Sequence, residues 1–124
     1  MQNDNQREPE ALLPLTPAVF HILLALADGQ KHGYAIMQEV GARTGSSMRM
    51  GPGTLYGSIQ RMLKDNLIIE SRERADSAQG EERRRYYHLT GFGQRVLQAE
   101  ARRLEQLVHI AQSKQVLPGF PRCL

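Results

Sequence analysis

Residues 52–66, PGTLYGSIQRMLKDN, place the strongest constraint on the fold. Leu55, Ile59 and Met62 are spaced by four and three positions, which puts them in one row on an α-helix. The proline that opens the stretch suits the first helical position, because its missing N–H would be unpaired there anyway. Asn66, at the end of the same row, suits a left-handed C-terminal cap. The pattern predicts a short helix with an apolar back and sharp ends.

The opposite side of this helix carries small or polar residues and one cation: Thr54, Gly57, Ser58, Arg61 and Asp65. A slim face of this kind fits the major groove of DNA, where a bulky or acidic face does not. We expect Thr54 and Ser58 to reach phosphate or base edges, and Arg61 to reach phosphate or guanine. The alternative is an ordinary solvated face, since most amphipathic helices simply lie on a core.

Three further residues are candidates for DNA contact beside that face. Arg49 and Lys64 flank the helix and are candidates for contact with phosphate. Tyr56 lies near the helix start, where its hydroxyl either reaches a phosphate or belongs to an aromatic side chain at the edge of the core. The sequence leaves these two roles of Tyr56 open.

Two other helices are predicted before the central one. Thr16 followed by proline is a start signal for a helix over residues 17–27. A second helix is expected over residues 33–43, after a short connection at residues 30–32 with room for a brief extended segment. Three helices joined in this way are compatible with a helix-turn-helix core.

After residue 66 the apolar pattern changes to that of strands. Residues 67–72 and 83–89 are predicted to be two strands joined by a turn over residues 75–82. Tyr87 and Leu89 share one face of the second strand. Two strands directly behind a candidate recognition helix form a wing, which we place at residues 75–85.

The densest run of cations lies in this wing, at Arg83, Arg84 and Arg85. We expect Arg83 and Arg84 to contact phosphate ahead of Arg85, whose position in the strand matches the inward Tyr87. The alternative is a solvated strand end in which the arginines pair with nearby glutamates.

The last helix is expected over residues 91–114, with Thr90 as its cap. Its apolar residues step by four and three positions: Leu97, Ala101, Leu104, Val108 and Ala111. This seven-residue repeat is typical of helices that pair. The helix would be roughly 36 Å long, more than a three-helix core can cover. We therefore expect a homodimer formed along this helix.

The expected fold is mostly α with a small β-hairpin wing, a winged helix-turn-helix with a C-terminal dimerisation helix. The 124 residues divide into a flexible N-terminal tail (1–14), a DNA-binding domain (15–89), the dimerisation helix (90–114) and a C-terminal tail (115–124). The formal charge of +3 permits a nucleic-acid partner without demanding one. Affinity for DNA must therefore come from the placement of cations on one face.

Several function classes are excluded or disfavoured. The single cysteine, Cys123, rules out an internal disulfide and a Cys-rich zinc site, and leaves a redox role open. The scattered histidines lack metal-binding spacing, and no cofactor is expected. No apolar run is long enough to span a bilayer and no signal segment is present, so a cytoplasmic protein is expected. An enzyme is not expected, because no nucleophile lies with a base and no loop cradles phosphate.

Three motifs occur in a specific order and spacing: HGY at residues 32–34, GTLY at 53–56 and YYHLT at 86–90. Together they resemble the PadR-like winged-helix transcriptional regulators, over about residues 15–107. The resemblance implies a dimeric, cytoplasmic, DNA-binding repressor, often relieved by a small-molecule effector or a stress signal. Asn66 stands where that family usually has glycine, and Glu81 and Glu82 reduce the positive charge of the wing tip.

The leading interpretation is a homodimeric, sequence-specific regulator, a repressor, that binds double-stranded DNA. Its helix at 52–66 would enter the major groove and its wing would lie on the backbone. The dimer would read a palindromic operator with half-sites about one helical turn apart. The alternative is a winged-helix protein-interaction module without its own operator, which the nearly equal numbers of both charges between residues 61 and 85 favour.

Overall fold

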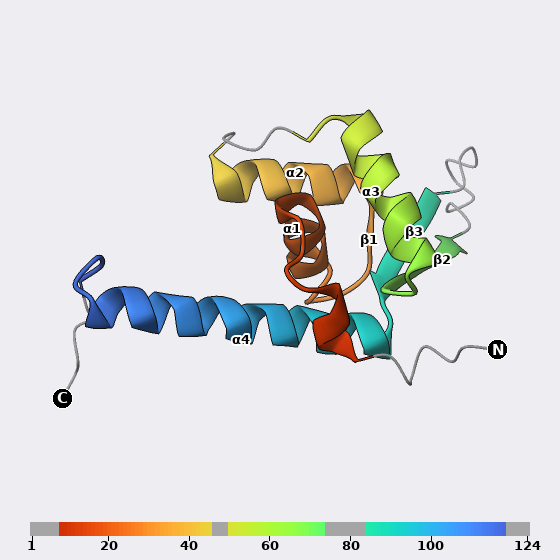
Figure 1. Cartoon of the computed structure of the whole chain (residues 1–124). Coiled ribbons are helices and arrows are strands. Elements are labelled where there is room, and N and C mark those ends of the chain that lie inside the picture. Colours follow the sequence, from red (N-terminus) through yellow and green to blue (C-terminus); the bar gives the residue numbers. More distant parts are fainter. Residues whose placement is uncertain (1–7, 46–49, 74–83, 119–124) are drawn as a thin grey trace.

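The computed structural model describes residues 8–45, 50–73 and 84–118. The elements, in chain order, are η2 (Pro9–Leu12), α1 (Pro17–Ala25), β1 (Lys31–His32), α2 (Gly33–Thr44), α3 (Pro52–Lys64), β2 (Ile68–Glu73), β3 (Arg84–Leu89) and α4 (Gly91–Ser113). Figure 1 shows α1 between α2 and α4, with α3 and the strands at one end of the molecule. The predicted fold class, mostly α with a small wing, is confirmed. Within the described ranges, no helix combines the length and apolarity needed to cross a membrane.

Side chains cap the first two helices at the expected places. The Thr16 hydroxyl accepts a hydrogen bond from the Val19 N–H at 3.2 Å, which fixes the start of α1. The Nδ1 atom of His32 accepts one from the Ala35 N–H at 3.3 Å and starts α2. The helix α1 ends at Ala25, two residues before the expected end.

The helix α3 has the apolar row that the sequence predicts. Leu55, Ile59 and Met62 are almost fully buried, and burying each such side chain contributes about 1.5–3 kcal/mol to stability. Asn66 has a φ of 63°, which confirms the left-handed cap. The Leu67 N–H then donates to the Met62 carbonyl at 2.9 Å, so the end of the helix is sharply defined.

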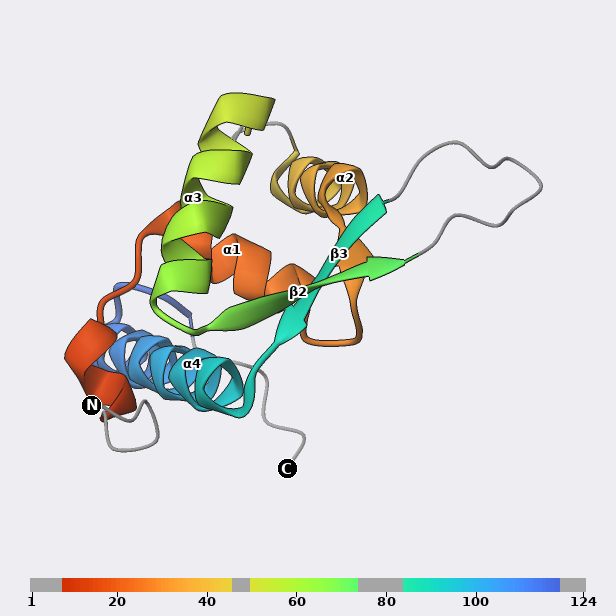
Figure 2. The ribbon, with the colours of Figure 1, turned by 90° about the vertical axis from the view of Figure 1, so that its right-hand side faces the viewer.

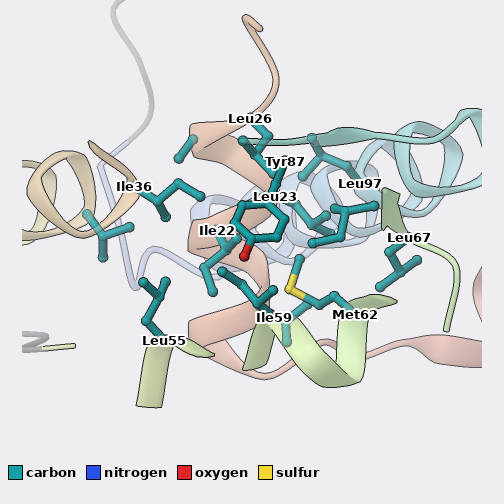
Figure 3. Close-up of a cluster of buried hydrophobic side chains, with 14 of the residues drawn as sticks. Ile22, Leu23, Leu26, Ile36, Leu55, Ile59, Met62, Leu67, Tyr87 and Leu97 are labelled. Atoms are coloured by element: carbon teal, nitrogen blue, oxygen red, sulfur yellow. The ribbon is translucent and has the colours of Figure 1, made fainter. Parts of the chain in front are cut away.

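The strands form one antiparallel sheet in the order β1-β3-β2. The central strand β3 pairs Tyr87 with Lys31 of β1 and Leu89 with Ile68 of β2. The expected brief extended segment at residues 30–32 thus adds a third strand to the wing. Figure 3 shows Tyr87 among the aliphatic side chains of the core, and this burial raises the pKa of its hydroxyl. The turn expected at residues 75–82 lies outside the described residues.

The N-terminal segment differs from the flexible tail expected over residues 1–14. Residues 9–12 form the short helix η2, which packs against α4. The Leu15 N–H donates to Glu100 Oε2 at 3.0 Å, and Arg103 Nε donates to Glu100 Oε1 at 2.6 Å. Glu100 is only 2% exposed. The hydrogen bond from Arg103 lowers the pKa of this carboxyl group, so it remains ionised in the folded state.

The helix α4 begins against the corner where α3 ends and β2 begins. The Thr90 hydroxyl donates to the Asn66 carbonyl at 2.7 Å and accepts from the Gly93 N–H at 2.8 Å. A Cβ atom at position 93 would overlap the backbone carbonyl of Leu67, whereas one at position 91 would meet open space. The absence of a side chain at Gly93 therefore allows α4 to approach this corner.

The second half of α4 extends beyond the rest of the molecule (Figure 1). Leu97 lies in the first half of the helix and is buried in the protomer's own core. Leu107 and Ile110 lie in the second half and are about half exposed, at 49% and 51%. Of the residues expected to pair, Leu97 is therefore covered by other helices of the same chain, whereas the second half of α4 keeps exposed apolar side chains.

Gly93→Ala should lower the free energy of unfolding by about 2–3 kcal/mol or more, because the added methyl group meets a backbone carbonyl that cannot turn away. Gly91→Ala on the same helix is the matched control and should change it by at most about 1 kcal/mol. Urea unfolding followed by circular dichroism measures both values. Equal stability of the two variants would contradict the close contact.

Glu100→Gln should lower the free energy of unfolding at neutral pH by about 1–3 kcal/mol, because it removes a buried charge that accepts hydrogen bonds from Arg103 and Leu15. The pKa of Glu100 is lowered in the folded state. The advantage of the wild-type protein is therefore complete above the ordinary glutamate pKa of about 4.3 and disappears as the pH falls through the lower, folded-state value. Glu105→Gln, at an exposed position of α4, is the control and should have little effect. A difference from wild type that is independent of pH would argue against an ionised Glu100.

Candidate nucleic-acid interface

The outer side of α3 carries five of the residues that the sequence singles out. Thr54, Arg61 and Lys64 are exposed, Tyr56 is 45% exposed and Ser58 is half-buried. Thr54, Arg61 and Lys64 face away from the core because the buried row occupies the other side of the same helix. Between Pro52 and Lys64 the helix carries two cations and no acidic residue, and Asp65 follows directly after its last residue. This surface offers hydroxyl donors and positive charge together.

Gln60 belongs to the same exposed side, although the sequence reasoning did not select it. It is exposed and lies four residues from Tyr56 and four from Lys64, so all three share one stripe of the helix. Helical spacing from Tyr56 was the signal that could have identified it. A glutamine amide both donates and accepts hydrogen bonds, which suits contact with base edges as well as phosphate.

Tyr56 connects α3 to the start of α2. A Cβ atom at position 33 would lie 2.5 Å from the Tyr56 hydroxyl oxygen, so the ring is packed directly over Gly33. The side chain is nevertheless 45% exposed. Of the two roles that the sequence left open, the structure therefore supports packing at the core edge while leaving part of the side chain accessible.

The strands lie beside α3 at the same end of the molecule (Figures 1 and 2). Arg84 is the first residue of β3, but its side chain lies outside the described part of the structure, as do Arg49 and Arg83 altogether. Arg85 is exposed, and its Nε atom lies 3.5 Å from Glu70 Oε2. This ion pair matches the alternative expected for the wing arginines, in which their charge is balanced within the hairpin.

The described residues differ in what they offer to a metal ion and to a polyanion. They contain no group of three or more His, Cys, Asp or Glu side chains close enough to hold a metal ion. The surface of α3 instead presents hydroxyl and amide groups with two cations. These groups are the ones that proteins use to contact phosphates and base edges.

A family model described as the transcriptional regulator PadR-like family matches residues 22–99, more than half of the chain. The chain is 34% identical over 99 residues to the transcriptional regulator Rv3488 of Mycobacterium tuberculosis, covering 80% of this chain and 81% of that protein. It is also 36% identical over 86 residues to an uncharacterized 37.1 kDa protein in transposon TN4556 of Streptomyces fradiae. That match covers 69% of this chain but spans only 22% of the length of the transposon protein.

Solved structures share the fold. The structure of Bacillus subtilis PadR in complex with operator DNA matches with a TM-score of 0.62 and 17% identity, covering 82% of this chain and 63% of that chain. At this identity the likeness concerns the fold alone. The family model and the relative from Mycobacterium tuberculosis carry the assignment: the chain belongs to the PadR-like family of transcriptional regulators, which are DNA-binding regulators and not enzymes.

Proposed function

We propose that this chain is a homodimeric repressor that binds a palindromic operator in double-stranded DNA. The observation that carries the proposal is the outer side of α3, where Thr54, Gln60, Arg61 and Lys64 are exposed and only Asp65, just after the helix, adds a negative charge. Such a surface suits a groove lined by phosphates and base edges. A small-molecule or stress signal that relieves repression, and a cytoplasmic location, belong to the same proposal.

The shape of α3 supports entry into the major groove. An α-helix with its side chains is about 10–12 Å across, close to the groove width of about 12 Å. Gly53 and Gly57 lie on the exposed side, and neither position has a neighbour that a side chain would meet. Their lack of side chains keeps the helix narrow, so its backbone can approach the floor of the groove closely.

The wing supplies the proposed contact with the DNA backbone. The sheet lies beside α3 (Figure 2), so a duplex held by α3 passes near the hairpin. We propose Arg83 and Arg84 as the residues that contact phosphate there, and Arg49, which precedes α3 in the sequence, as a phosphate contact beside that helix. Arg85 contributes less, because its guanidinium lies next to the carboxylate of Glu70.

The proposed dimer forms through the second half of α4. Its apolar residues are half-buried or half-exposed and gather on one side: Leu104, Leu107, Val108, Ile110 and Ala111. They continue the core-facing stripe of the first half, but the protomer's own core ends before them (Figure 1). A second copy of the same helix is the partner that a seven-residue repeat favours. The first two expected dimerisation residues, Leu97 and Ala101, contribute less, since Leu97 is in the protomer core.

Arg61→Ala should weaken binding by about 1–3 kcal/mol if Arg61 reads a base, because a bidentate arginine contact is lost. Binding is measured by fluorescence anisotropy on a duplex that the wild-type protein selects from a random pool. Arg102→Ala, at an exposed position of α4, is the matched control and should bind as the wild-type protein does. An unchanged titration for Arg61→Ala would remove this residue from the site.

Leu107→Glu should convert the dimer to a monomer at micromolar concentration, because it places a charge in the apolar surface that pairs. Gln98→Glu adds the same charge at an exposed position of the same helix and should leave the dimer intact. Sedimentation velocity measures the oligomeric state of both variants. A Leu107→Glu variant that stays dimeric would place the interface elsewhere.

A protein-docking function is the second candidate. The ion pair between Arg85 and Glu70 favours this function, because it balances a positive charge of the wing that would otherwise attract DNA. The selection experiment separates the two functions. A docking module would enrich no duplex from the pool at low salt, whereas a regulator would.

A further inference from the structure

We infer that Tyr34 of α2 is a second contact to the DNA backbone, made through its hydroxyl group and independent of the cations of α3 and the wing. The inference rests on the proposed function, because it requires a duplex that lies on α3. The ligand chemistry is that of a phosphodiester oxygen, which accepts the tyrosine proton.

Tyr34 is an aromatic residue that the core does not use. It lies in the first turn of α2, and its side chain is 59% exposed. The neighbouring positions of the helix, Gly33 and Ile36, are buried. Tyr34 is therefore directed outward by the same helix that buries its neighbours, and its exposure has no explanation in packing.

The hydroxyl group of Tyr34 is oriented but keeps its proton available. Gln38, one turn further along α2, donates from Nε2 to this hydroxyl oxygen at 3.3 Å. A tyrosine hydroxyl both accepts and donates, and in the described part of the chain no group takes the proton of Tyr34. The hydrogen bond from Gln38 thus orients the Tyr34 hydroxyl, whose own O–H remains able to donate to a group in solution.

The position of α2 places this donor on the path of a bound duplex. The helix α2 contacts both α3 and β3, and Figure 2 shows it between the two. Gly33, next to Tyr34 in the chain, lies under the Tyr56 hydroxyl of α3. A duplex that meets both α3 and the hairpin therefore crosses the start of α2, where Tyr34 is exposed.

The position of Tyr34 on α2 favours a contact with the DNA backbone over a contact with the bases. Tyr34 belongs to the helix that precedes the recognition helix, and in helix-turn-helix proteins that helix crosses the backbone while the recognition helix occupies the groove. A neutral hydroxyl displaces no condensed counterion, so it adds affinity without adding salt dependence. This property distinguishes Tyr34 from a lysine or arginine contact.

The test measures the dissociation constant of Tyr34→Phe across a salt series on two labelled duplexes. One is selected from a random pool by the wild-type protein and the other has an unselected sequence. We expect binding roughly threefold to tenfold weaker for each Tyr34 in the complex, the effect of one lost hydrogen bond. The loss should be the same on both duplexes, and the slope of log Kd against log salt should not change. Urea unfolding checks that the variant is as stable as the wild-type protein.

Gln38→Ala is the second variant, because it removes the group that orients the hydroxyl. It should weaken binding less than Tyr34→Phe does, and by the same factor on both duplexes. Gln94→Ala, at an exposed position of α4, is the control and should leave the dissociation constant unchanged. Unchanged binding by Tyr34→Phe on both duplexes would overturn the inference, and so would a loss confined to the selected duplex, which would mean base reading. If the wild-type protein binds neither duplex, the proposed DNA-binding function itself fails, which is a separate result from any comparison of variants.

Discussion

The backbone carbonyl of Leu67 lies where α3, β2 and α4 meet, and the arrangement of the protein depends on the contacts made there. The Thr90 N–H donates to this oxygen at 3.0 Å, the Thr90 hydroxyl also reaches it at 3.1 Å, and Gly93 leaves room for it. The left-handed conformation of Asn66 directs the chain into this corner. These contacts fix α4 directly to the end of α3, so the position of the proposed recognition helix relative to the proposed dimerisation helix is set at this corner.

A second connection joins α4 to the segment that precedes α1. Glu100 accepts hydrogen bonds from Leu15 and Arg103 while it is almost fully buried. A buried carboxylate is tolerated only when it is paired and hydrogen-bonded, and here both conditions hold. The segment then continues into Thr16, the cap of α1. The start of the helical core is thereby attached to α4 at a point far along the sequence.

Local patterns in the sequence predicted the elements well, because caps and helical periodicity depend on neighbouring residues. The start of α3, its buried row and the left-handed Asn66 were all predictable for this reason. The buried Glu100 was not, since its partner Leu15 is distant in the sequence. Leu97 was assigned to pairing because periodicity gives the side of a helix but not how far the protomer's own core extends along it. Tyr34 belongs to the HGY motif, but the motif does not tell whether its side chain is buried or, as the structure has it, 59% exposed.

The inner and outer rows of α3 are separate sets of residues, and this separation has an evolutionary consequence. Leu55, Ile59 and Met62 hold the helix in place, whereas Thr54 and Gln60 contribute nothing to that burial. Substitutions at Thr54 and Gln60 therefore carry little cost in stability. With the proposed recognition surface on this outer row, a lineage built on the same fold can acquire a preference for new DNA sequences one residue at a time, long before its backbone structure diverges.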